Sequence, residues 1–82
     1  MLTNEEILIL RKNYILKNFN YLSPNEKIFC YKDNKFTVKE MGGGSLYKLK
    51  VNDKVLYIGY EEETVLENII SFIVKKHFIT TY

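Results

Sequence analysis

Two β-hairpin patterns in the middle of the chain constrain its fold more than any other feature. Residues 27–32 and 35–39 form the first pair of alternating segments, and residues 46–51 and 54–60 form the second. An Asp/Asn pair separates the two segments in each case, and both residue types tolerate the positive φ of a tight turn. The pattern therefore predicts two antiparallel hairpins joined by a glycine-rich loop at residues 42–45.

Placing two-residue turns at Asp33-Asn34 and Asn52-Asp53 sets the register of both hairpins, because side chains alternate between the faces of a strand. The side chains predicted to face the core are Phe29, Tyr31, Phe36, Val38, Tyr47, Leu49, Leu56 and Ile58. The side chains predicted on the outer face of the sheet are Ile28, Cys30, Thr37, Lys39, Lys48, Lys50, Val55 and Tyr57. This outer face mixes lysines with apolar residues.

Helical periodicity flanks the hairpins on both sides. The first helix is predicted from Thr3 to about Asn18–Asn20, with Ile9 and Leu16 on the face opposite its main apolar stripe. The second is predicted from about residue 62 to 78, with acidic residues at its start and cations at its end, as the helix dipole favours. The order α-β-β-β-β-α predicts an α+β two-layer sandwich. It has a four-stranded antiparallel sheet with both helices on one face.

Composition bounds the class of protein. At 82 residues and a formal net charge of +2, the chain predicts a single domain over residues 1–82. Apolar runs are far shorter than the ~18 residues of a membrane span, so we expect no membrane partner. A lone cysteine fits a reducing compartment, and we expect a cytoplasmic protein. Abundant Lys, Asn, Ile, Tyr and Phe indicate an AT-rich genome.

The chain carries no pattern typical of catalysis, so we expect no enzyme. Cys30 and His77 are the only residues that suggest a nucleophile with its base, yet nothing in the sequence near Cys30 would activate a thiol. One Cys and one His cannot supply a zinc site of the usual type. A strand rather than a helix follows the glycines, which argues against a phosphate loop and favours a flexible connection. We expect neither a metal nor another cofactor.

Three surfaces are candidates for binding a partner. The first is the outer sheet face with Lys39, Lys48, Lys50, Val55 and Tyr57. The second is the acidic start of the last helix, where Glu61, Glu62 and Glu63 suit a basic partner. The third is the back of the first helix, where Ile9 and Leu16 suit a protein partner or a homodimer.

These observations predict a small non-enzymatic binding protein that occludes or modulates a macromolecular partner, with a protein as the expected partner. An 82-residue chain of this kind suits a phage or mobile-element product that inhibits or modulates a host factor. The alternative is a weak nucleic-acid-binding module. In that case the lysines contact phosphates and Tyr57 stacks on a base.

Overall fold

The computed structural model describes residues 3–78, without the side chains of residues 5, 6, 77 and 78. In chain order, its elements are α1 (Asn4–Ile9), α2 (Lys12–Lys17), β1 (Asn20–Ser23), β2 (Glu26–Tyr31), β3 (Asn34–Met41), the 3-10 turn η1 (Gly42–Gly44), β4 (Leu46–Val51), β5 (Lys54–Gly59), α3 (Glu62–Ile73) and the π-helical turn η2 (Val74–Phe78).

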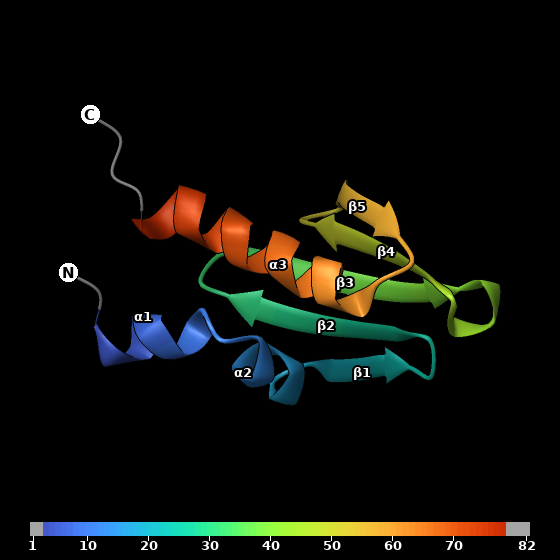
Figure 1. Ribbon diagram of the computed structural model, residues 1–82, viewed down its shortest axis with the longest axis horizontal. Helices are drawn as coiled ribbons and strands as arrows, with labels where there is room; N and C mark the ends of the chain where they lie inside the picture. The colour runs from blue at the N-terminus through green and yellow to red at the C-terminus, as the bar shows by residue number, and fades with distance from the viewer. Residues whose placement is uncertain (1–2, 79–82) are drawn as a thin grey trace.

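The strands form one antiparallel sheet of five strands in the order β1-β2-β3-β4-β5, and α3 runs across one of its faces (Figure 1). Helix α2 packs beside α3. The predicted α+β class and antiparallel sheet are confirmed. The predicted count of four strands and two helices is wrong, because the first helix is divided in two and the residues after it form an additional strand.

The first helix breaks because two isoleucines must reach the same core. Ile9 and Ile15 lie six positions apart, which in a straight helix places them about 120° from each other. In the structure Arg11 is extended, with φ −96° and ψ 128°, and both isoleucines are buried. The break therefore corrects the prediction that Ile9 faces outward from the helix.

Strand β1 pairs with the start of β2, with Tyr21 opposite Lys27. The Nζ atom of Lys27 lies 4.8 Å from the centre of the Phe19 ring and 5.8 Å from that of Tyr21. These cation–π contacts favour an extended chain here over a further helical turn. The turn expected around Pro24 is present and connects these two strands.

The turn of the next hairpin lies one residue earlier than predicted, at Lys32-Asp33, so that Phe29 pairs with Phe36. Asn34 is 1% exposed, and its Oδ1 atom accepts hydrogen bonds from Asn52 at 3.1 Å and Lys76 at 3.3 Å. These tertiary bonds hold Asn34 inside the strand against its local preference for a turn. The pairing moves by two positions, which leaves Phe29 and Phe36 on the core face as predicted.

The last hairpin has the predicted turn, because Asn52 and Asp53 both have positive φ (49° and 71°). A β-bulge then follows, since Lys50 pairs with Val55 whereas Leu49 pairs with Tyr57. The extra residue reverses the alternation of β5 beyond it. The prediction that Leu56 and Ile58 face the core is therefore wrong; they are 36% and 54% exposed.

Tyr57 takes the inward position that the bulge opens and packs against the core. Gly59 makes room for this ring, because a Cβ atom at Gly59 would overlap the tyrosine hydroxyl. The prediction that Tyr57 lies on the outer sheet face is therefore also wrong.

Sheet and helices enclose one apolar core. Its buried members are Ile9, Ile15, Phe29, Phe36, Val38, Leu49, Val51, Val65, Leu66, Ile69 and Ile73. The glycine segment predicted as a loop connects β3 to β4, and Gly42, Gly43 and Gly44 all have positive φ. Glycine adopts that conformation without the penalty of a side chain.

Candidate functional site

The face of the sheet away from the core is the main candidate for function, and we call it the open face. Pairing between strands arranges its central side chains in two rows. From β2 to β5, the first row is Glu26, Lys39, Lys48 and Ile58, and the second is Ile28, Thr37, Lys50 and Val55. All eight side chains are exposed or half-buried, and those of β2, β3 and β4 alternate with buried residues.

Lys39, Lys48 and Lys50 lie together at the centre of the open face, as the sequence predicted, and we call them the lysine cluster. Lys39 and Lys48 are direct cross-strand partners, and Lys50 follows Lys48 on the same side of β4. With Glu26, Thr37 and Met41 they line a pocket of about 130 Å³. Among the residues that the structure describes, none of the three lysines has an ion-pair partner.

An apolar strip borders the lysine cluster at the edge of the sheet. Val55, Leu56 and Ile58 are 52%, 36% and 54% exposed, and β5 is the last strand of the sheet. The sequence pattern placed only Val55 here, because it took no account of the bulge. Gly59 was the available signal, since glycine inside a strand often marks a bulge or a close approach.

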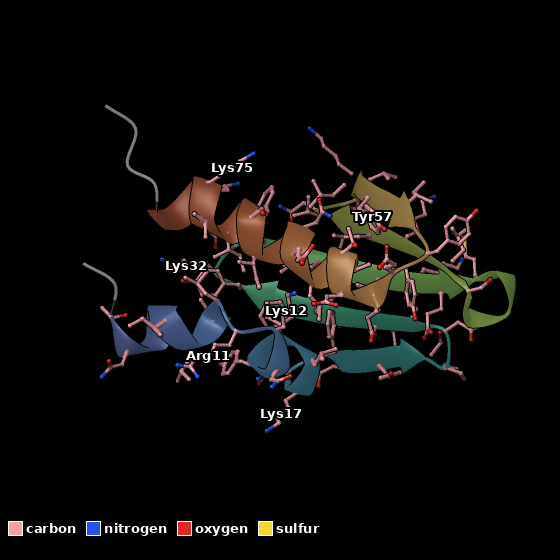
Figure 2. The ribbon with its side chains drawn as sticks, viewed as in Figure 1. Arg11, Lys12, Lys17, Lys32, Tyr57 and Lys75 are labelled. Atoms are coloured by element: carbon pink, nitrogen blue, oxygen red, sulfur yellow. The ribbon has the colours of Figure 1, made fainter. Side chains whose placement is uncertain are left out.

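The acidic triplet is largely engaged within the protein. Glu62 binds the Nζ atom of Lys27 at 2.8 Å, and Glu63 binds that of Lys12 at 2.7 Å. Figure 2 shows Lys12 between α2 and α3, where it also reaches Glu67 at 3.1 Å. Only Glu61, the exposed residue before α3, forms no ion pair among the described side chains. The triplet is therefore a poor surface for a basic partner.

The pair between α2 and α3 shifts the pKa of both of its members. The hydrogen bond from Lys12 lowers the pKa of Glu63, because it stabilises the carboxylate. The hydrogen bonds to Glu63 and Glu67 raise the pKa of Lys12 above its usual 10.5. Both groups are exposed to solvent, so this ion pair between α2 and α3 contributes little to stability.

The predicted patch on the first helix is not formed. Ile9 is buried at 5% exposure and Leu16 is 38% exposed, so the two do not share an outer surface. A groove of about 670 Å³ lies instead between the α1–α2 segment and β2, with walls that include Leu8, Tyr14 and Ile28. The exposed thiol of Cys30 also borders this groove.

The side chains of the open face that the structure describes are of types that bind partners. The side chain of His77 lies outside the described residues, so its place relative to Cys30 is not defined. Among the residues described, no three His, Cys, Asp or Glu side chains gather as metal ligands would. The lysine cluster can attract anions, and the neighbouring apolar strip can exclude water from a contact.

Comparisons with protein-family models, curated proteins and solved structures find no match to this chain. Within the part of the chain that the structure describes, no helix has the length and apolar character needed to cross a membrane.

Proposed function

We propose that this chain is a non-enzymatic binding protein that docks its open face on an acidic surface of a protein partner and so occludes it. The single observation that carries this proposal is the lysine cluster. Its three cations lie side by side without an acidic ion-pair partner among the described residues. Charge complementarity with an acidic partner would relieve their repulsion and set the orientation of docking.

The apolar strip supports a protein as the partner. Val55 and Ile58 are exposed cross-strand partners of Lys50 and Lys48, and Leu56 is exposed between them in the chain. A contact that covers the open face would bury these apolar side chains together with the lysines and remove apolar area from water, which favours association.

A nucleic acid is the second candidate partner, because the same lysines could contact phosphates. The sequence-based case for it relied on Tyr57 as a stacking platform, and that ring packs against the core. The two cross-strand rows of the open face contain no aromatic side chain. Stacking on aromatic rings supplies much of the affinity for single strands, so an acidic protein is the better candidate.

Fluorescence anisotropy tests the proposal with two labelled probes, a peptide that alternates glutamate with leucine and a 20-nucleotide oligothymidylate. We expect the variant Lys48→Glu/Lys50→Glu to bind the peptide at least about tenfold more weakly, because both contacts become repulsive. The matched control is Lys17→Glu/Lys75→Glu, since both side chains are exposed and point away from the body of the protein (Figure 2). Equal weakening by the two variants would contradict the proposal.

Substitutions in the apolar strip and the salt dependence of binding distinguish the two candidate partners. We expect Val55→Ser/Ile58→Ser to weaken binding of the peptide and to leave that of the oligonucleotide unchanged. Tighter binding of the oligonucleotide, with a steep loss of affinity between 50 and 200 mM salt, would replace the proposal with the second candidate.

A further inference from the structure

The pocket within the lysine cluster has the features of an anion site. Its lining residues include Lys39, Lys48, Lys50 and Thr37, whose ammonium groups and hydroxyl are hydrogen-bond donors. Its volume of about 130 Å³ is roughly four times the ~30 Å³ that a water molecule occupies, which leaves room for a tetrahedral oxyanion.

The charges around the pocket are unbalanced. Three lysines and one carboxylate, that of Glu26, line it, which gives a formal charge of 3 − 1 = +2. Glu26 pairs across the strands with Lys39, at the edge of the cluster and not between Lys48 and Lys50. A phosphate monoester carries about −1.5 to −2 charges at pH 7, which is the complement of this sum.

The cross-strand pair within the cluster has a thermodynamic consequence. Lysines directly opposite each other in an antiparallel pair destabilise a sheet, and Lys39 and Lys48 are such a pair. An anion held between them would convert the repulsion into two favourable contacts. Binding and fold stability should therefore be linked at this position.

From this geometry we propose that the pocket formed by Thr37, Lys39, Lys48 and Lys50 binds a phosphoryl group carried on a side chain of the protein partner. The inference rests on the proposed function, because it names the group by which the open face holds that partner. Three ammonium groups and a hydroxyl suit the several oxygens of a phosphoryl dianion, whereas a carboxylate offers two oxygens and a single charge.

The first test measures thermal unfolding of the full chain with inorganic phosphate against chloride at equal ionic strength. A phosphate concentration ten times the Kd should raise the Tm by about 6–11 °C. Lys48→Gln should raise the Tm in chloride, because it removes the repulsion, and should weaken phosphate binding about tenfold. Glu26→Gln should strengthen phosphate binding, and Lys17→Gln should change neither quantity.

Two results would overturn the proposal. A phosphate-dependent rise of the Tm in Lys48→Gln equal to that of the unmodified chain would place the anion elsewhere, and weaker phosphate binding by Glu26→Gln would contradict the charge balance of the pocket. Amide chemical shifts give an independent reading. Phosphate should move the signals of Thr37, Lys39, Lys48 and Lys50, and movement confined to the helices would overturn the proposal.

A second test separates this inference from the proposed function. One acidic peptide is prepared in two forms, with a phosphoserine or a glutamate at its centre, and we expect the phosphorylated form to bind at least about tenfold more tightly. Equal affinity for the two forms would overturn the phosphoryl site and leave the proposed function standing. Failure of both forms to bind would overturn both. Inorganic phosphate that binds as tightly as the phosphopeptide would also overturn the inference, because the partner side chain that carries the phosphoryl group would then contribute nothing to the affinity.

Discussion

The two faces of the sheet use their lysines in opposite ways. On the covered side, Lys27 binds Glu62 and lies against Phe19 and Tyr21. On the open face, Lys39 and Lys48 stand opposite each other with no ion pair among the described side chains. The charge of Lys27 is thus balanced by a carboxylate of the same chain, whereas the charges of the lysine cluster have no ion-pair partner among the described side chains.

The apolar residues differ between the faces in the same way. Phe36 is fully buried and contacts the rings of Phe29 and Phe72. Ile58 is equally apolar but is 54% exposed at the edge of the open face. The covered face therefore supplies the apolar packing that stabilises the fold, and truncating a side chain there should cost far more stability than truncating one on the open face.

The largest difference in stability is expected between variants of two adjacent residues of β3 whose side chains lie on opposite faces of the sheet. Phe36→Ala should destabilise the fold by about 3–5 kcal/mol, because it leaves a cavity among packed rings. Thr37→Ala should cost about 1 kcal/mol or less, because its side chain lies on the open face and mainly strand propensity is lost. Urea unfolding followed by circular dichroism measures both. Similar losses in the two variants would show that the open face is covered as well.

A smaller loss of stability is expected when the buried Lys27 loses its counter-charge. Glu62→Gln should cost about 1–3 kcal/mol, because it leaves the Lys27 ammonium buried without its counter-charge. Glu61→Gln is the matched control, since Glu61 is exposed and is not in an ion pair among the described residues. Equal urea midpoints for the two variants would show that the Lys27 pair adds nothing to the fold.

The smallest effect concerns the exposed pair between α2 and α3, and it depends on pH. Since the pKa of Glu63 is lowered in the folded state, its contribution to stability is present above the usual 4.5 and is lost as pH falls through the lowered value. The raised pKa of Lys12 keeps its contribution in place until pH rises through that raised value. The urea midpoint of Glu63→Gln should therefore lie slightly below that of the unmodified chain at pH 7.

At acid pH the two midpoints should converge as the carboxyl of Glu63 becomes protonated. A difference that persisted unchanged well below pH 4 would mean that another interaction of residue 63 holds the helices together.

The sequence predicted those features that depend on local pattern. Alternation predicted both hairpins, the Asn52-Asp53 turn and the inward position of Phe36, and it placed the lysine cluster on one face. The sequence did not predict the features that tertiary contacts determine. The turn between β2 and β3 lies one residue earlier than predicted because the side-chain oxygen of Asn34 accepts hydrogen bonds from Asn52 and Lys76. Ile9 reaches the core only because the first helix breaks.

The candidate site was predictable up to the bulge. The lysines precede it along the chain and were placed correctly, whereas Tyr57 and Ile58 follow it and were exchanged between the faces. Every position beyond an inserted residue inherits the error, because the period of a strand is two. A glycine two positions after an aromatic residue was the one local sign that the alternation had changed.

The bulge, more than the composition of β5, decides which side chains border the lysine cluster. Deletion of Leu56 would remove the extra residue and leave Tyr57 opposite Leu49 and Ile58 opposite Lys48, so the two faces would keep these side chains. Pairing of the present chain without the bulge would instead set Leu56 opposite Leu49 and Tyr57 opposite Lys48, which would turn Tyr57 outward and Ile58 inward. A single unpaired residue thus determines whether the lysines meet an apolar or an aromatic border, without a substitution at any lysine.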